Sequence, residues 1–331
     1  MPLSKTLWAS AWANAAGAPP IPEYSLDSNV SISSTAQTTD VAANFFDKGG
    51  FLLTNPKMVV VFIGDWSNSQ SQMKSLYQFC KDMMQGTLLD VLKQYGFKSG
   101  NVVGSAIIPT KQTSFSEPTL GLLLQDAINK KILPEPVDKQ MCYMLFFSDN
   151  IGFSDPGLQL SLCEPKNSSA FGFHHDLITL AGNKLIYSFI PSLNDACITS
   201  TCARSTSCSL STSETQLQRQ TQVASHEFAE MVTNPLGTGW FNVKTGDEIG
   251  DVCNGTNTNM TVGGNTWLVQ KIYSKTDDQN TSGRATCFGD TQSTSALEVA
   301  QRLSNQDLLI LAGIAGALMF ISGLVSRFRR S

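Results

Sequence analysis

ASHEFAEMVTNP, residues 224–235, is the stretch around which the rest of this 331-residue chain is organised. Apolar side chains recur through it at helical spacing, as at Phe228 and Met231, so we expect a helix over residues 214–232. Pro235 ends this helix, because proline cannot continue the hydrogen-bond pattern. A helix here decides which of the polar side chains share a face.

The polar residues of this helix suggest a metal site. His226 and Glu230 lie four residues apart and therefore point to the same side. With Glu227 beside them, they match the zincin-like His-Glu-x-x-His helix of zinc hydrolases, with glutamate in place of the second histidine. A carboxylate is a competent zinc ligand, so the pattern predicts zinc at His226 and Glu230, with Glu227 as the catalytic base. The alternative is a structural helix whose buried histidine is paired with carboxylates.

A third ligand has to come from another part of the chain. The acidic stretch GDEIGDVC, residues 246–253, follows closely enough for the chain to fold back onto the helix. Glu248 is the favoured third ligand, and Asp251 and His174 are the other candidates. Zinc bonds of about 2.0–2.2 Å require ligand atoms within about 3–4 Å of one another. We therefore expect at least one of the three to lie a few ångströms from His226.

The fold is predicted from runs of apolar, β-branched and aromatic residues, which are typical of strands buried on both faces. Helical patterns separate them, so we expect one α/β domain with a single parallel or mixed sheet flanked by helices. The predicted strands are 58–63, 102–108, 141–147 and 185–190, and the predicted helices between them are 70–95, which Gly86 can divide, and 119–131.

The remaining segments are less regular. Residues 148–182 are rich in Gly, Pro, Asp and Ser and are expected to be irregular, and residues 192–213 are expected to form a Cys- and Ser-rich loop. A turn-rich link over 237–246 and a late strand over 267–273 complete the expected domain.

Composition points to an extracellular protein. The net charge of -4, with no basic stripe, gives no reason to expect nucleic acid as a partner. Eight cysteines fit a disulfide framework, so we expect most of them to be oxidised. Five Asn-x-Ser/Thr sequences are candidate glycosylation sites: Asn29, Asn167, Asn254, Asn259 and Asn280.

The cysteines allow one other interpretation. Cys197, Cys202 and Cys208 lie close together in the sequence and could bind zinc with His174 or His175. Their spacing is not that of two Cys-x-x-Cys hooks, which makes a disulfide framework the favoured interpretation.

The C-terminal region contains a predicted transmembrane helix. Residues 308–325 carry no charge, and eighteen residues at about 1.5 Å each just span a bilayer. The arginines in 326–331 place this tail in the cytosol and the main domain outside. A buried core helix is the alternative, and the basic end argues against a glycolipid-anchor signal. A Ser/Thr-containing stalk over 291–307 precedes the span.

The N-terminal region is weakly defined. Residues 1–18 are a candidate signal peptide, with a disordered arm as the alternative. Residues 19–54 form an expected arm, rich in Ser, Thr and Pro near its start.

Four stretches together resemble the Exordium, or phosphate-induced, family of extracellular plant proteins and their microbial relatives. The resemblance covers roughly residues 55–290, in consistent order. Phe171 departs from it by standing where the family usually has cysteine, and the membrane helix is not a usual family feature. The stretches are VVVFIGDWS (59–67), MLFFSDN (144–150), FGFH (171–174), and the block formed by SHEFAE (225–230), TNP (233–235) and EIGDVC (248–253).

The resemblance implies a protein of the cell surface or wall, associated with growth control. Together with the candidate zinc helix, it leaves two functions open. The first is a surface-anchored zinc-dependent hydrolase. Its helix resembles that of zinc peptidases, and glycans or esters are alternative substrates to peptides. The second is a non-catalytic protein that binds wall polysaccharide or a protein partner, with Trp66, Trp240 and Trp267 as candidates for stacking on sugars. A secreted or wall-bound protein is the alternative to a membrane-anchored one.

Overall fold

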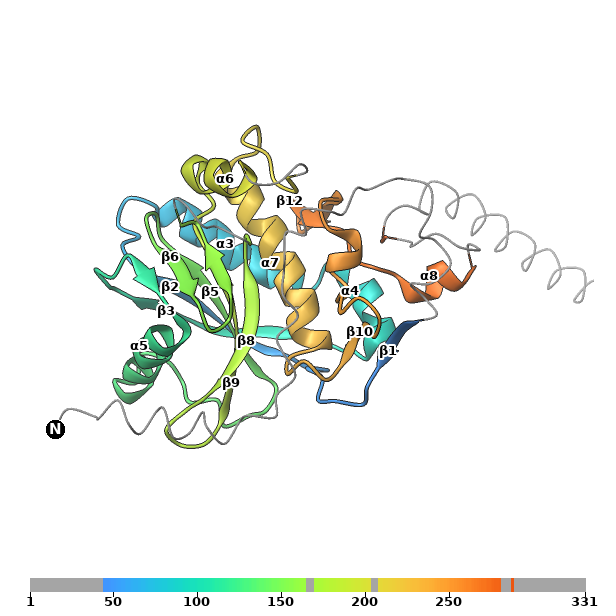
Figure 1. Cartoon of the computed structure of the whole chain (residues 1–331), viewed down its shortest axis with the longest axis horizontal. Coiled ribbons are helices and arrows are strands. Elements are labelled where there is room, and N and C mark those ends of the chain that lie inside the picture. Colours follow the sequence, from blue (N-terminus) through green and yellow to red (C-terminus); the bar gives the residue numbers. More distant parts are fainter. Residues whose placement is uncertain (1–43, 165–169, 204–207, 281–286, 289–331) are drawn as a thin grey trace, which may run out of the picture. The chain divides into compact units, whose positions relative to one another are not determined.

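A five-stranded sheet forms the middle of the fold (Figure 1). The structure, a computed structural model, describes residues 44–164, 170–203, 208–280 and 287–288. All of them belong to a unit that ends at Phe288, and the second unit, 289–331, lies outside the described residues. In spatial order the strands are β3 (Asn101–Ile108), β2 (Lys57–Ile63), β5 (Met141–Phe147), β9 (Lys184–Ile190) and β8 (Phe173–Ile178).

The sheet is mixed. Strands β3, β2, β5 and β9 are parallel, and β8 pairs antiparallel with β9 at the edge. The four strands predicted from the sequence are confirmed, all in this one sheet. The continuous apolar character of β2, β5 and β9 follows from burial on both faces, which is the usual setting of parallel strands. Strand β3 lies at the edge of the sheet and is partly exposed.

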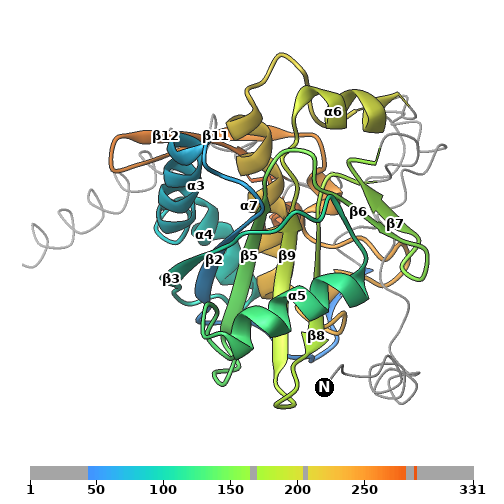
Figure 2. The same ribbon diagram turned by 90° about the vertical axis from the view of Figure 1, so that its left-hand side faces the viewer.

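Helices cover both faces of the sheet (Figure 2). In β2, Met58, Val60 and Phe62 face one core, and the residues between them face the other. The first core lies under α3 (Gln70–Met83), α4 (Leu88–Leu92), its 3-10 extension η1 (Lys93–Tyr95) and α7 (Gln216–Thr233). The second lies under α5 (Glu117–Asn129). Gly86 separates α3 from α4, as expected.

Helix α7 is buried along nearly its whole length. Thr215 caps it, its side chain accepting a hydrogen bond from the backbone of Gln218, and Asn234 ends it before the proline. Polar groups of α7 bond to the late hairpin: Thr221 donates to the carbonyl of Leu268 at 2.7 Å. A helix enclosed in this way holds its side chains in fixed positions, which suits a site built on it.

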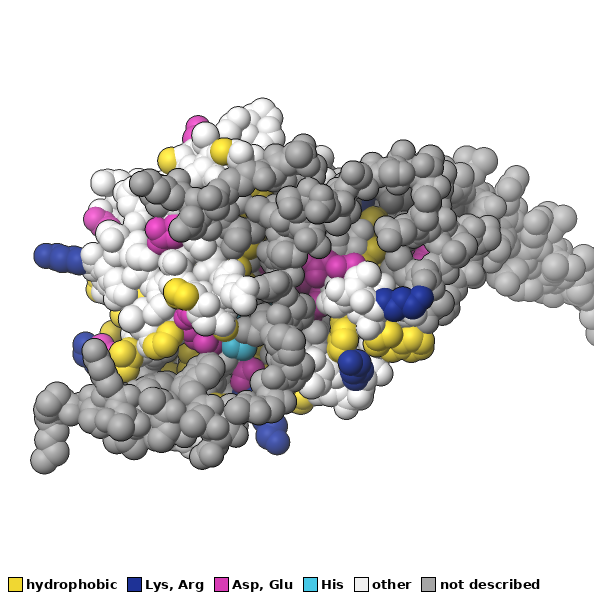
Figure 3. All heavy atoms as spheres, viewed as in Figure 1, with side chains coloured by type: hydrophobic (Ala, Val, Ile, Leu, Met, Phe, Trp, Pro, Cys, Tyr) yellow, Lys and Arg dark blue, Asp and Glu magenta, His cyan; other side chains and the backbone are white. Residues whose placement is uncertain are grey.

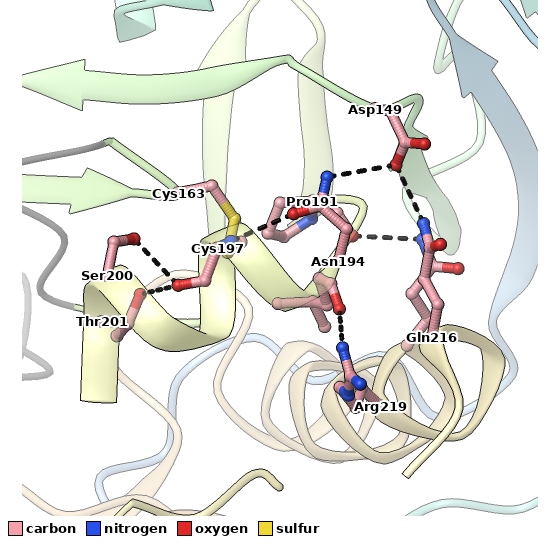
Figure 4. Close-up of a disulfide and its surroundings, with 11 residues drawn as sticks. Asp149, Cys163, Pro191, Asn194, Cys197, Ser200, Thr201, Gln216 and Arg219 are labelled. Atoms are coloured by element: carbon pink, nitrogen blue, oxygen red, sulfur yellow. Dashed lines mark hydrogen bonds between the residues drawn. A yellow bond between two sulfur atoms is a disulfide. The ribbon is translucent and has the colours of Figure 1, made fainter. Parts of the chain in front are cut away.

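Arg219 fastens the start of α7 to the segment before it. Its guanidinium is buried, donates to the carbonyl oxygens of Leu193 at 2.8 Å and Ser211 at 2.9 Å, and lies 2.6 Å from an Asp195 carboxylate oxygen. Part of this segment is the helix α6 (Asp195–Cys202), tied by the Cys163–Cys197 disulfide (Figure 4). The expectation of an entirely irregular loop over 192–213 is therefore corrected.

Smaller sheets surround the central one, so the expectation of a single sheet is also corrected. Residues 148–182 were expected to be irregular but contain three strands, because short strands with polar residues give little periodic signal. The additional elements are a three-stranded sheet of β4 (Ser114–Phe115), β6 (Gly152–Asp155) and β7 (Leu160–Leu162), a hairpin of β11 (Asn257–Val262) and β12 (Asn265–Gln270), and a pair of β1 (Phe45–Asp47) and β10 (Trp240–Asn242), together with the 3-10 turn η2 (Asp251–Cys253) and the helix α8 (Lys275–Asn280).

The terminal predictions fall largely outside the described residues. The candidate signal peptide 1–18, the stalk 291–307, the membrane span 308–325 and the tail 326–331 all lie there. Within the part that is described, no helix has the length and apolar character needed to cross a bilayer. The predicted arm 19–54 is described from Asn44 onward, and its strand β1 pairs with β10.

Six of the eight cysteines form three disulfides, which fits an extracellular protein. The pairs are Cys163–Cys197, Cys202–Cys208 and Cys253–Cys287. The alternative of a zinc site at Cys197, Cys202 and Cys208 is wrong, because each of these sulfurs is used in a disulfide. Cys80 and Cys142 are free and lie in the core.

The disulfide pattern predicts the outcome of a thiol titration. Without reductant, the unfolded protein should show two thiols, Cys80 and Cys142, and the native protein almost none. Burial raises the pKa of both thiols, so they are neither accessible nor ionised in the folded chain. Titration with an aromatic disulfide reagent, with and without guanidinium, checks this. Recovery of most of the eight thiols from unreduced protein would contradict the disulfide assignment.

Candidate metal centre

Helix α7 supplies the first three side chains of the site. Glu230 and His226 lie one turn apart, with His226 Nε2 at 3.1 Å from Glu230 Oε1. Both are buried, Glu230 to 1% exposure. Glu227, next to His226 in sequence, is buried as well. The helical spacing seen in the sequence thus brings the predicted pair together.

Strand β8 delivers His174 to the same place. Its Nδ1 lies 3.5 Å from Glu227 Oε2 and 3.6 Å from Glu230 Oε2. The next residue, His175, points to the other face of the sheet, where its Nε2 is 2.9 Å from Glu117 Oε1 at the start of α5. The alternation of side chains along β8 therefore selects His174 for the site.

The segment leading into η2 supplies two further carboxylates. Asp251 Oδ1 lies 3.9 Å from His226 Nε2, and Glu248 Oε1 lies 3.7 Å from His174 Nε2. The Cys253–Cys287 disulfide ties this segment down at its end. All three groups proposed as the third ligand, namely Glu248, Asp251 and His174, thus reach the cluster from outside the helix.

Among the described residues, two sets of three side chains could hold a metal ion. One is His226, Glu230 and Asp251, and the other is His174, Glu227 and Glu230; in each, the candidate ligand atoms lie within 4.8 Å of one another. Glu248, the ligand favoured by the sequence, belongs to neither set. It approaches His174 through the nitrogen opposite the one that faces Glu227 and Glu230.

The cluster contains more negative than positive charge. Four carboxylates converge on two imidazoles, so two negative charges remain even when both rings are protonated. Burial raises the pKa of Glu227 and of Glu248, whereas it is outweighed at Glu230, where His226 and then His174 lower the pKa to about 2. Without a cation, the remaining charge is reduced by protons on carboxylates.

The two histidines respond to the same charges. Burial by itself lowers the pKa of His226, but the Glu230 carboxylate outweighs it and raises that pKa to about 10. At His174, burial is likewise outweighed, chiefly by Glu248, and the pKa lies well above its ordinary value. The surrounding carboxylates therefore favour the protonated form of both rings in the metal-free protein.

Two neutral residues that the sequence did not single out complete the surroundings. Gln270 on β12 places Nε2 2.7 Å from His226 Nδ1 and donates to the Gly250 carbonyl at 2.8 Å. Asn234 donates to Glu248 Oε1 at 2.7 Å. When His226 is protonated or bound to metal through Nε2, its Nδ1 carries hydrogen, and the Gln270 amide must turn to offer oxygen.

Some buried polar atoms at α7 lack a partner among the described residues. Glu230 Oε1 accepts no hydrogen bond of acceptable geometry, despite its proximity to His226. The amide of Gln222, one turn before His226, makes none either. Such orphaned groups are costly in a folded protein and are typical of positions where an ion or water binds.

Glycine is needed where the chain passes closest to the cluster. A Cβ at Gly250 would lie 2.7 Å from both Glu230 Oε1 and His226 Nδ1. A Cβ at Gly172 would lie 2.8 Å from Glu227 Oε1 on the other side of the cluster. The glycines in EIGD and FGFH are therefore explained by close approach of the backbone to the site.

The cluster lies near the surface at two of its members. The side chains of His174 and Asp251 are 11% and 17% exposed, and the other four are more deeply buried. In Figure 3 a histidine is visible among acidic side chains on the face shown.

The remaining predicted residues are three tryptophans and five candidate glycosylation sites. Trp66 and Trp267 are buried in the core, which excludes them as exposed platforms for sugars, and Trp240 packs against Phe45 and Tyr95. Among the candidate glycosylation sites, two are exposed, and the other three lie outside the described side chains. The exposed sites are Asn254 and Asn259, and the others are Asn29, Asn167 and Asn280.

Comparison of the chain with protein families, with curated proteins and with solved structures finds no match.

We expect the metal-free protein to lose stability as the pH rises from 6.5 toward about 10. A histidine whose pKa is raised in the folded chain stabilises the folded state. This stabilisation is complete below the pKa of the unfolded state and is lost as the pH rises through the pKa of the folded state. For His226 those limits are 6.5 and about 10. The raised pKa values of Glu227 and Glu248 act in the same direction. The melting temperature, measured in the presence of a chelator, should fall as the pH rises across this range, and it should fall less steeply in His226→Gln. Equal slopes for the wild-type protein and the variant would contradict the raised pKa assigned to His226.

A second prediction concerns Gly250. Gly250→Ala should destabilise the protein by about 1–3 kcal/mol, because the new methyl group overlaps Glu230 and His226. Gly121→Ala is the matched control: Gly121 lies within α5, and its nearest neighbouring atom is 3.8 Å from the added Cβ. There, alanine should be neutral or slightly stabilising. Urea unfolding measures both changes, and equal effects would show that the close approach at Gly250 is unimportant.

Proposed function

We propose that the protein is a zinc-dependent hydrolase that acts outside the cell. The observation that carries this proposal is the convergence of six ionisable groups from three separate segments, four of them buried, with an excess of two carboxylates. A structural ion-pair cluster needs only balanced charge, whereas this one has an excess of negative charge and a Glu230 oxygen that accepts no hydrogen bond of acceptable geometry. A divalent cation would supply the balancing charge and bind that oxygen.

His226, Glu230 and Asp251 are the proposed zinc ligands. They combine the helical pair with Asp251, whose Oδ1 lies 3.9 Å from His226 Nε2, and their candidate ligand atoms lie within 4.8 Å of one another. Zinc bound there would act as a Lewis acid and lower the pKa of a coordinated water. Asp251 is therefore the proposed third ligand, in place of Glu248, the ligand favoured by the sequence.

Glu227 is the proposed general base. Burial raises its pKa, which brings the carboxylate closer to the range useful for proton transfer near neutral pH. His174 lies 3.5 Å from Glu227 Oε2 and holds the carboxylate in place. Glu248 faces the other side of the His174 ring and orients it.

The ligand set favours a modest activator. Two carboxylates neutralise the charge of a divalent zinc ion, so the pKa of its water is lowered less than at a site of three histidines. Peptide bonds are the bonds most often cleaved by hydrolases whose zinc site is built on a helix of this kind. Glycans and esters are the other substrate classes to be screened.

The Exordium-like resemblance supports the proposed setting. It covers the segments that build the cluster, and the three disulfides are typical of extracellular or secreted proteins. We propose an Exordium-like protein of the cell surface or wall, with the predicted span 308–325 as its membrane anchor.

Metal binding and turnover should separate in two variants. His226→Ala should weaken zinc binding by more than about 100-fold and abolish activity, because it removes a ligand. Glu227→Gln should keep zinc affinity but lower kcat by about 10²–10⁴, because it removes the base. Zinc titration and hydrolysis of fluorescein-labelled casein measure the two effects.

Glu117→Gln is the control for these variants. It alters another buried glutamate beside a histidine, His175, on the opposite face of the same strand, and should change neither readout. A purified protein that binds no zinc, with a melting temperature unaffected by zinc or chelator, would sink the proposal.

A further inference from the structure

The two carboxylate oxygens of Glu230 face different histidines. Oε1 lies 3.1 Å from His226 Nε2, and Oε2 lies 3.6 Å from His174 Nδ1. We propose that the cluster binds two divalent cations side by side, with Glu230 as the bridging carboxylate. This inference rests on the proposed function and deepens it, because the second cation changes the role of Glu227.

Each position has an equivalent set of donors. The first has His226, Asp251 and one oxygen of Glu230, and the second has His174, Glu227 and the other oxygen of Glu230. The distances between facing donor atoms are 3.1–3.9 Å, close to those between ligands around one ion with bonds of about 2.0–2.2 Å. Bridged pairs of metal ions lie about 3.5–4 Å apart, a distance that one carboxylate spans.

Charge selects two ions over one. A ligating imidazole is neutral, so the four carboxylates contribute four negative charges when the site is loaded. One divalent cation leaves two of them uncompensated in a buried cluster, whereas two cations bring the six groups to neutrality. Uncompensated buried charge is strongly unfavourable, so with one ion bound the two remaining negative charges must be neutralised by protons on carboxylates. A second ion removes that requirement.

Each histidine also has its own support on the ring nitrogen that faces away from the proposed ion. Gln270 lies 2.7 Å from His226 Nδ1, and Glu248 lies 3.7 Å from His174 Nε2. Metal-bound histidines are generally oriented by such a partner. At each ring a polar group therefore lies behind the nitrogen that faces the proposed ion: the Gln270 amide at His226, and the Glu248 carboxylate, at a longer distance, at His174.

A second cation makes Glu227 a ligand instead of a base. The two interpretations therefore differ in a measurement that needs no substrate. If one ion binds at His226, Glu230 and Asp251, Glu227→Gln leaves the metal content unchanged. If two ions bind, Glu227→Gln reduces the content from two ions per chain to one.

The experiment uses the full-length protein, stripped with a chelator and reloaded with Mn²⁺. Bound manganese is counted by elemental analysis against protein concentration, and electron paramagnetic resonance tests whether the ions are exchange-coupled. We expect two coupled ions per chain. Glu227→Gln and Asp251→Asn should each retain one uncoupled ion, and Glu117→Gln should retain the coupled pair.

The outcomes separate this inference from the proposed function. One ion in the wild-type protein, retained in Glu227→Gln and lost in Asp251→Asn, overturns the second cation and leaves the hydrolase proposal standing. No bound ion, with zinc as with manganese, overturns both. Two ions without coupling overturn the Glu230 bridge. Circular dichroism and the count of free thiols establish that each variant is folded before its metal content is compared.

Discussion

Keeping the Glu230 carboxylate charged inside the protein is the constraint on which the site depends. A carboxylate with 1% exposure is tolerated only where positive charge compensates for the lost water. His226, one helical turn away, and His174, from β8, provide this charge and hold the Glu230 pKa at about 2. The helix itself supplies only His226. The second partner, His174, depends on the position of β8 against α7, so this packing is also needed to keep Glu230 charged.

The fold meets this requirement by enclosing α7. Strands β8 and β9 pack on one side of the helix and β12 on another, and Figure 1 shows α7 between them. The segment that carries Asp251 ends at the Cys253–Cys287 disulfide, which closes a loop with a sequence separation of 34 residues. In the chain-entropy account such a cross-link is worth about 4 kcal/mol. The disulfide thus offsets part of the cost of holding like charges together.

The cluster has two ways to balance its charge, and they compete. Protons do so in the metal-free protein, as cationic rings and protonated carboxylates. In the proposed metal-bound state, divalent cations take over this role after those protons leave, which would couple metal affinity to pH. The close packing of Gly172 and Gly250 against the cluster serves either arrangement.

The sequence by itself determined the parts of this protein that depend on local periodicity. The three inner strands β2, β5 and β9 were predicted because burial on both faces leaves a continuous apolar run, and the pairing of His226 with Glu230 follows from 3.6 residues per turn. Only the tertiary structure decided which distant groups join them. Edge strand β8 alternates too weakly to be recognised, yet its register turns His174 toward α7 and His175 toward Glu117. Likewise, the sequence does not distinguish between Glu248 and Asp251 as ligands. The path of one short loop places Glu248 next to His174 and Asp251 next to His226. Such contacts depend on the packing of the whole domain, which no local pattern encodes.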